Sequence, residues 1–203
     1  MVQMPAAASV NRFHTALLGA LGTPVGYYAR PDVREALTLR LMREVGVRLL
    51  IIDELHNLLG ASAGRQREML NLLRFLGNDL RIPLVCLGIR DAYLAIRSDD
   101  QLENRFHPFL LPLWEHGEDY ARLLTSFETI LPLREPSPLA APALADLILR
   151  RSEGTIGEIA TLLSRATAAT LLQGAELIDS TSIARAEYQP PSIRRQMMER
   201  AMR

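Results

Sequence analysis

Residues 49–57 read LLIIDELHN, in which four aliphatic residues run directly into two adjacent acids, Asp53 and Glu54. A short run that is apolar on both faces is typical of a strand buried in a parallel sheet. Ligands of open α/β sheets bind beyond the carboxyl ends of such strands, which is where these two acids would stand. The stretch therefore predicts an α/β fold with a candidate site at Asp53 and Glu54.

The two acids have the chemistry of a nucleotide-hydrolysing site. An Asp in this position can hold Mg²⁺, directly or through water, and a neighbouring Glu can orient and deprotonate an attacking water molecule. A simpler alternative stays open, because acids that follow a strand can also face the positive N-terminus of the next helix. A hydrolytic site would, in addition, need a loop that holds phosphates.

The sequence contains no recognisable loop of that kind. All 23 basic residues are Arg and Lys is absent, so the phosphate-binding pattern GxxxxGK[ST] does not occur. The Gly-rich stretches GALGTPVG (19–26) and GASAG (60–64) lack the Lys and the following Ser or Thr. These residues therefore predict the water-activating half of a site without its phosphate-cradling half.

Apolar runs alternate with helical patterns on both sides of the 47–53 strand. Val2–Met4 and the run IPLVCLG at 82–88 read as further buried strands, and FLLPL at 109–113 reads as a weaker one. Helical periodicity occupies the intervals, at about 9–22, 31–46 and 63–76. Such alternation indicates crossover units and a parallel sheet.

A change of composition after residue 131 divides the sequence. The stretch PLREPSPLAAP at 132–142 contains four Pro in eleven residues, which is typical of a linker or a domain edge. Beyond it the patterns are helical, at 143–151, 155–173 and 180–187, followed by the terminal segment SIRRQMMERAMR. We therefore expect an α/β part over residues 1–131 and a small all-helical part over residues 132–203.

Composition excludes several classes of protein. The formal net charge is +0, so a DNA contact would have to be a local patch. The single Cys, Cys86, excludes a disulfide framework and a cysteine-ligated zinc cluster. No apolar run approaches the ~18 residues of a membrane span, and the first residues lack the features of a signal peptide. We expect a cytoplasmic protein without membrane contact.

Other polar residues are weaker candidates for function. His56 and Asn57 can contact the carboxylates of Asp53 and Glu54 or cap the following turn, and no paired-His spacing supports a zinc site. Arg105, in LENRF, precedes the 109–113 run and could reach a phosphate on a neighbouring subunit, or simply pair with an acid such as Glu103. Two arginine pairs are possible contacts to DNA phosphates or simply solvated charges, namely Arg65 with Arg67 and Arg194 with Arg195.

The segment 49–106 resembles the TniB-type AAA+ ATPases of transposons, which are relatives of TnsC. The resemblance rests on IIDE-H-N, NLLRFLGN, the IPLV-x-x-G strand, AYLAIRSDDQLENRF and the S-x-G-x-I-G-E start of a lid helix at 152–158. It implies a partial AAA+ P-loop NTPase core followed by a small helical lid. It further implies ATP and Mg²⁺ as cofactors, with ATP binding coupled to target DNA selection and transposase recruitment.

The resemblance also implies residue roles. Asp53 corresponds to the metal-binding acid of the Walker B motif, Glu54 to the catalytic base and Arg105 to an arginine finger on a self-association surface. In the AAA+ strand order 5-1-4-3-2, the runs at 2–4, 47–53, 82–88 and 109–113 correspond to strands two to five. The first strand and the phosphate loop would then lie ahead of residue 1.

Two departures from the family pattern weaken ATP hydrolysis by this chain. Ile89 replaces a polar residue after the fourth strand, and the lid helix carries no Arg at the usual position, although Arg150 and Arg151 lie just before it. We expect the chain alone to bind ATP weakly or not at all. One hypothesis is a truncated transposition regulator; the others are a non-catalytic interaction module that contacts subunits or the transposase, and a decayed product that does not fold cooperatively.

Overall fold

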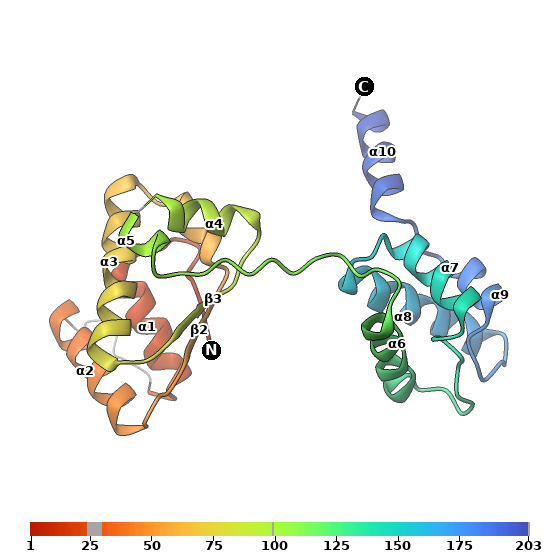
Figure 1. Ribbon diagram of the computed structural model, residues 1–203, viewed down its shortest axis with the longest axis horizontal. Coiled ribbons are helices and arrows are strands. Elements are labelled where there is room, and N and C mark those ends of the chain that lie inside the picture. The colour runs from red at the N-terminus through yellow and green to blue at the C-terminus, as the bar shows by residue number, and fades with distance from the viewer. Residues whose placement is uncertain (24–29, 99, 203) are drawn as a thin grey trace. The chain divides into compact units, whose positions relative to one another are not determined.

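Three short parallel strands form the sheet in the computed structural model of the chain, which describes residues 1–23, 30–98 and 100–202 (Figure 1). The strands are β1 (Val2–Gln3), β2 (Leu50–Asp53) and β3 (Leu84–Cys86), in the order β1-β2-β3. Val2 pairs with Ile52, and Leu50 pairs with Leu84. The predicted α/β class is confirmed, and the order agrees with strands two, three and four of the AAA+ arrangement.

The chain divides into two units, Met1–Phe109 and Leu110–Arg203. Helices of the first unit follow its strands: α1 contacts α2, α3 and β1, and α4 contacts η1. Their bounds are α1 (Val10–Ala20), α2 (Pro31–Glu44), the 3-10 helix η1 (Leu55–Gly60), α3 (Ala63–Leu80), α4 (Arg90–Arg97) and α5 (Asp100–Glu103). Phe13, Ile52 and Leu73 are fully buried in the core of this unit.

Helix α3 is longer than its sequence predicts. Its periodicity predicts a helix over about 63–76, but it continues through Gly77 and Asn78 to Leu80 and ends where Arg81 adopts a left-handed conformation (φ 54°). Leu76 is fully buried, and Gly77 faces Leu84 of β3: a Cβ atom on Gly77 would lie 3.5 Å from Cδ1 of Leu84. Packing against β3 therefore carries the helix past two residues of low helix propensity.

The predicted strand at 109–113 is wrong, because these residues form no regular structure. Phe109, Leu110 and Leu111 are 84%, 85% and 80% exposed. An apolar strand needs a neighbouring strand for its backbone hydrogen bonds. In the expected strand order that neighbour is strand one, and β3 pairs only with β2 in the described sheet.

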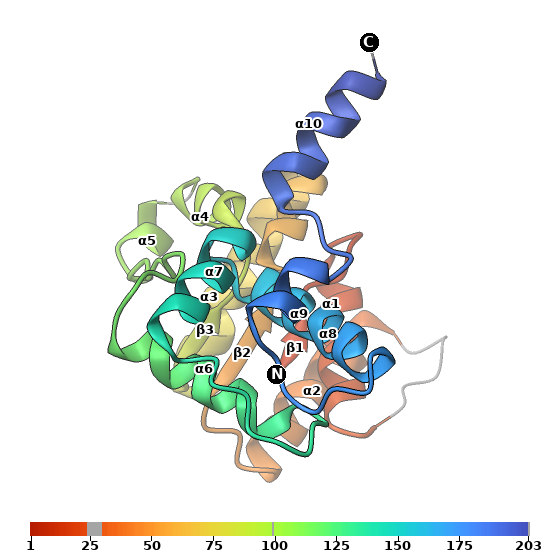
Figure 2. The same ribbon diagram turned by 90° about the vertical axis from the view of Figure 1, so that its right-hand side faces the viewer.

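The second unit is entirely helical in its described residues (Figure 2). Its core buries Leu124, Ile148, Ile159 and Ile183. The helices are α6 (Glu118–Ile130), α7 (Pro142–Ser152), α8 (Ile156–Leu172), α9 (Ser180–Arg185) and α10 (Pro191–Ala201).

The boundary between the units lies ahead of the division expected after residue 131. Helix α6 belongs to the second unit because Tyr120 and Leu124 are buried in its core. Among the described residues, no helix combines the length and the apolar character that a membrane crossing requires.

Candidate functional site

Asp53 ends β2 and is held on both its backbone and its side chain. Its carbonyl oxygen accepts a hydrogen bond of 2.8 Å from the backbone N–H of Met4, after β1. Its side-chain Oδ1 accepts a hydrogen bond of 2.8 Å from the backbone N–H of Glu54. One carboxylate oxygen is therefore oriented by the main chain at the carboxyl end of the sheet.

Glu54 turns the chain out of the strand. Its backbone is left-handed (φ 56°, ψ 35°), which costs a non-glycine residue about 1–2 kcal/mol. This turn ends the extended conformation of β2, and η1 begins at the next residue. The Glu54 side chain is about half exposed, and its Oε2 lies 3.1 Å from Nε2 of His56. The structure thus brings Asp53, Glu54 and His56 together.

His56 is packed on the side away from Glu54. Its Nδ1 is buried and has no hydrogen-bond partner among the described residues. A proton on Nε2 can donate to Glu54, whereas one on Nδ1 would lack an acceptor, so the geometry favours the Nε2–H tautomer. His56 therefore acts as a donor that fixes one oxygen of the Glu54 carboxylate.

Gly88 gives His56 its space. A Cβ atom on Gly88 would lie 2.7 Å from Cβ of Ala92 in α4 and 3.4 Å from Nδ1 of His56. The neighbouring backbone holds this close approach, because the Leu55 N–H donates to the Leu87 carbonyl over 3.0 Å. The sequence reasoning assigned no role to Gly88, although it is the Gly of the IPLV-x-x-G motif and directly follows the apolar run of β3.

Asn57 ties the site to β1 instead of contacting the carboxylates. Its Nδ2 donates a hydrogen bond of 2.9 Å to the Met4 carbonyl, and its backbone N–H donates to the Glu54 carbonyl over 2.9 Å. Of the two roles considered for this residue, the geometry corresponds to stabilising the turn.

The carboxylates fit Mg²⁺ only as one part of its coordination. Mg²⁺ is commonly held by one or two carboxylates together with water and substrate phosphates. Asp53 supplies hard oxygen donors of that kind, one of which already accepts a backbone N–H. Among the described residues, no group of three or more His, Cys, Asp or Glu side chains could enclose a metal ion. Asp53 and Glu54 could therefore supply only part of the coordination of such an ion.

Arg105 lies apart from these acids. It is exposed, and its Nη1 donates a hydrogen bond of 2.9 Å to Oδ1 of Asn78, near the C-terminal end of α3. Glu103, its alternative partner, lies 3.3 Å from Arg97. Because α3 begins near the site and rises about 1.5 Å per residue, Arg105 lies at the far end of that helix from Asp53.

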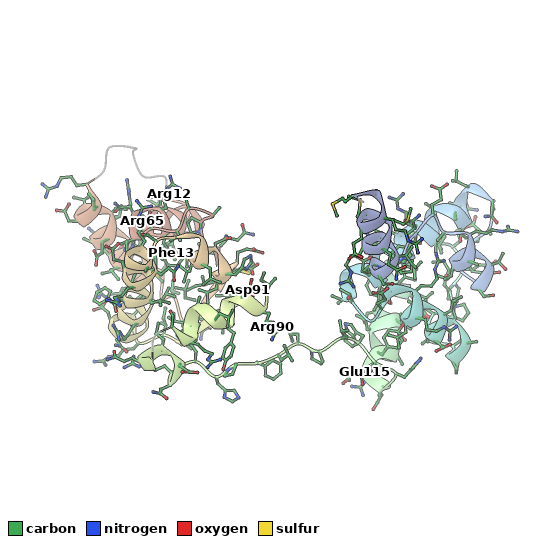
Figure 3. All side chains as sticks on the ribbon, turned by 90° about the horizontal axis from the view of Figure 1, so that it is seen from above. Arg12, Phe13, Arg65, Arg90, Asp91 and Glu115 are labelled. Atoms are coloured by element: carbon green, nitrogen blue, oxygen red, sulfur yellow. The ribbon has the colours of Figure 1, made fainter. Side chains whose placement is uncertain are left out.

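Arg65 and Arg67 are exposed near the amino end of α3, whose first turn contains no acid; Arg65 is labelled in Figure 3. Neither forms an ion pair within the described part of the chain. Arg12 in α1, also labelled in Figure 3, is exposed as well. The amino end of α3 therefore presents positive charge together with the positive end of the helix dipole.

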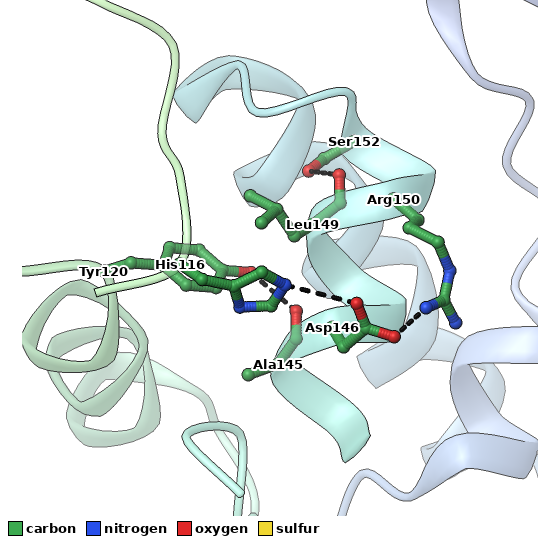
Figure 4. A network of polar contacts seen from close by, with 7 residues as sticks. All are labelled: His116, Tyr120, Ala145, Asp146, Leu149, Arg150 and Ser152. Carbon is green, nitrogen blue, oxygen red and sulfur yellow. Dashed lines mark hydrogen bonds and ion pairs between the residues drawn. The ribbon is translucent and has the colours of Figure 1, made fainter. Parts of the chain in front are cut away.

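The two arginines before the lid helix are held within the second unit. Arg151 donates to the carbonyls of Ile183 and Tyr188, the latter over 2.8 Å. Arg150 pairs with Asp146, whose Oδ1 also lies 3.2 Å from Nε2 of His116 (Figure 4). Arg151 thus ties α7 to α9, whereas the Arg150 pair lies within α7, and Asp146 links α7 to the segment before α6.

Tyr120 reinforces the same region. Its hydroxyl donates a hydrogen bond of 3.0 Å to the Ala145 carbonyl in α7, and burial raises its pKa to about 12. The contacts in Figure 4 therefore hold α6 and the segment before it against α7.

Known proteins resemble this chain both in sequence and in fold. The family model described as bacterial TniB protein matches residues 1–116. The solved structure of the Aeropyrum pernix ORC2 protein, in ADPNP–ADP complexes, matches with a TM-score of 0.66 and 18% sequence identity. The match covers 91% of this chain and 50% of the ORC2 chain. The chain thus spans half the length of that structure, and the likeness concerns the fold. A search of curated proteins found no matching sequence.

Proposed function

Because the chain belongs to the TniB family of AAA+ proteins, we propose that it acts as an ATP-dependent regulator of transposition. Such a regulator selects target DNA and recruits the transposase. The observation that carries this proposal is the pair Asp53 and Glu54 at the carboxyl end of β2, inside the matched residues. This is the edge of a parallel sheet at which ligands bind.

In this proposal each residue of the pair has a separate role. Asp53 holds Mg²⁺ through its carboxylate, and the ion supplies charge neutralisation at the phosphates. Glu54 accepts the proton of the attacking water, and the His56 contact of 3.1 Å keeps its carboxylate turned toward η1. Asn57 supports this arrangement through β1 rather than through the acids.

The phosphate-binding half is the first point to test. GASAG at 60–64 spans the end of η1 and the start of α3 without a Lys, and part of GALGTPVG lies outside the described residues. We therefore expect the chain alone to give no saturable binding of ATP–Mg²⁺ in titration calorimetry. Micromolar binding that is lost in Asp53→Ala would overturn this expectation and would place a complete nucleotide site in the chain.

Arg105 is proposed to act on a neighbouring copy. Its exposure and its position at the far end of α3 suit a contact in trans, since it cannot serve the acids of its own chain from there. Arg105→Glu should reduce self-association in sedimentation experiments. Arg48→Glu, another exposed arginine of the same unit, is the matched control; equal loss in both variants would point to net charge instead.

Target DNA is proposed to meet Arg65 and Arg67. Removal of phosphate contacts should weaken the affinity for DNA to the same extent whatever its sequence. The double variant Arg65→Ala/Arg67→Ala should also lower the slope of log affinity against log salt by about 2. Fluorescence anisotropy with duplex DNA measures both quantities. An unchanged slope would remove these residues from the interface.

The second candidate is a non-catalytic interaction module that contacts other subunits or the transposase. It is favoured by the absence of Lys from the chain and by the structural use of Arg151, which donates to the carbonyls of Ile183 and Tyr188. Under this alternative Asp53→Ala leaves transposase binding unchanged. Under the first proposal ATP strengthens transposase binding when a phosphate-binding loop is supplied, and Asp53→Ala abolishes that strengthening.

A further inference from the structure

The C-terminal helix α10 carries large apolar side chains that are exposed. Ile193, Met197, Met198 and Met202, which follows the helix, are 42%, 50%, 61% and 75% exposed. No residue of α10 is buried. Figures 1 and 2 both show the helix extending away from the other helices of its unit.

The first turn of α10 is nevertheless fixed. The Ser192 N–H donates a hydrogen bond of 3.0 Å to Oε1 of Glu153, and Arg194 pairs with Glu158. Oε2 of Glu158 also accepts a hydrogen bond of 2.8 Å from the Tyr188 hydroxyl. The direction of the helix is thus set at its start, while the rest of it remains uncovered.

The apolar side chains form one continuous face. At about 3.6 residues per turn, Ile193, Met197 and Ala201 follow one another along one line, and Met198 and Met202 follow along the adjoining line. Arg194 stands between these lines but reaches back to Glu158. The face therefore covers roughly half of the helix circumference.

Arginines border this face on both sides. The same helical geometry places Arg200 beside the Ile193 line and Arg195 beside the Met198 line. Gln196 and Glu199 lie on the opposite side of the helix. A surface that receives this helix would need an apolar floor and acidic residues along both rims.

Three kinds of occupant can be compared on these grounds. A second α10 would bring like charges together, because arginines border the face on both sides. Helices that lie on membranes usually carry Trp, Phe or Leu on their apolar face, and this face carries Met, Ile and Ala. Flexible Met side chains suit protein grooves.

We propose that α10 is a docking helix that inserts its apolar face into an acid-rimmed apolar groove of a partner protein. The inference rests on the proposed function in one respect, namely that the transposase is taken as the protein that carries the groove. The anchored first turn presents the helix ready-formed, so little ordering entropy opposes binding.

The test measures binding of the transposase encoded with this protein to the full chain, by calorimetry or biolayer interferometry. Met197→Glu and the double charge reversal Arg195→Glu/Arg200→Glu should each weaken binding at least about tenfold. Gln196→Glu adds the same negative charge on the polar side and should bind like the wild type. Because all these side chains are exposed, every variant should keep the wild-type thermal transition in circular dichroism.

The outcomes separate this inference from the proposed function. If the transposase binds the wild type and all variants equally, α10 is not the docking helix, and the proposed function stands. If the wild type does not bind the transposase, both the recruitment role and this inference fail. If α10 instead mediates binding to duplex DNA or to phosphatidylserine vesicles, with Met197→Glu or the charge reversal reducing it, the protein groove is overturned as its occupant.

Discussion

Gly88 is the residue at which the candidate site is most sensitive to a single methyl group. Gly88→Ala would place Cβ 2.7 Å from Cβ of Ala92, which is fixed to the α4 backbone. We expect a loss of about 1–3 kcal/mol in the free energy of unfolding, because α4 must shift away from η1. Chemical denaturation measures the change.

Gly19→Ala is the matched control for this prediction. Gly19 is helical in α1, and a Cβ there would meet nothing within 4 Å. Its replacement should leave stability unchanged or raise it by up to about 1 kcal/mol. Equal stability of both variants would show that α4 tolerates the added methyl group.

His14 should make the stability of the first unit depend on pH. The residue is buried in α1, and neither ring nitrogen has a hydrogen-bond partner among the described residues. Burial lowers the pKa of His14 below its ordinary value of 6.5; nearby Glu35 opposes this shift and Arg34 adds to it. The folded chain therefore holds this imidazole neutral under conditions in which the unfolded chain takes up a proton.

The sign of the effect follows from that difference. The contribution of neutral His14 to the free energy of unfolding is complete above pH 6.5. It is lost as the pH falls through the lowered pKa of the folded state. Relative to His14→Leu, the wild type should lose up to about 1.4 kcal/mol per pH unit in that range. Denaturation curves measured across it should diverge; parallel curves would mean that His14 is protonated equally in both states.

At the scale of elements, local pattern was a good guide where each element makes its own contacts. The three strands and the helices α1, α2, α3, α7 and α8 lie close to the positions that their apolar periodicity predicts. Asp53, Glu54 and His56 could be placed together because they are near neighbours in sequence at a strand end. The TniB family could be predicted from the combined motifs.

Features that depend on distant contacts could not be predicted in this way. Helix α4 was not expected, and its packing against η1 is what gives Gly88 its role. The partner of Arg105 is Asn78, 27 positions earlier in the chain, rather than its neighbour Glu103. The 109–113 run has the composition of a strand, but composition cannot supply the neighbouring strand that it needs.

The N-terminus of α9 offers a test of a single capping contact. Asp179 accepts hydrogen bonds from the Ser182 N–H (2.7 Å) and the Ser182 hydroxyl (2.9 Å), which lower its pKa. Asp179→Ala should cost about 1 kcal/mol of stability, whereas Asp179→Asn, which also caps well, should cost little. Thermal denaturation compares them; equal losses would assign the effect to the charge instead of the cap.

At the scale of the whole molecule, the division into two units should be visible to proteases. Phe109 is 84% exposed, lies at the division and has no regular structure around it, while aromatic residues such as Phe13 and Tyr120 are buried. Brief chymotrypsin treatment should therefore cut first after Phe109 and leave two fragments that resist further digestion.

Leu110→Pro provides the control, since chymotrypsin does not cut before Pro. The variant should lose the early cleavage without change in its circular dichroism spectrum. Early cleavage within a helix, with Phe109 intact, would mean that the exposed segment is covered in solution.

The two prolines of this segment limit how it can ever join a sheet. In extended chain, successive N–H groups point to opposite edges, so Pro108 and Pro112, four positions apart, remove donors from the same edge. The N–H groups of Phe109, Leu111 and Leu113 all point to the other edge. The segment therefore suits the border of a sheet better than a place between two strands, and the missing donors weaken the pairing of a further strand on that edge.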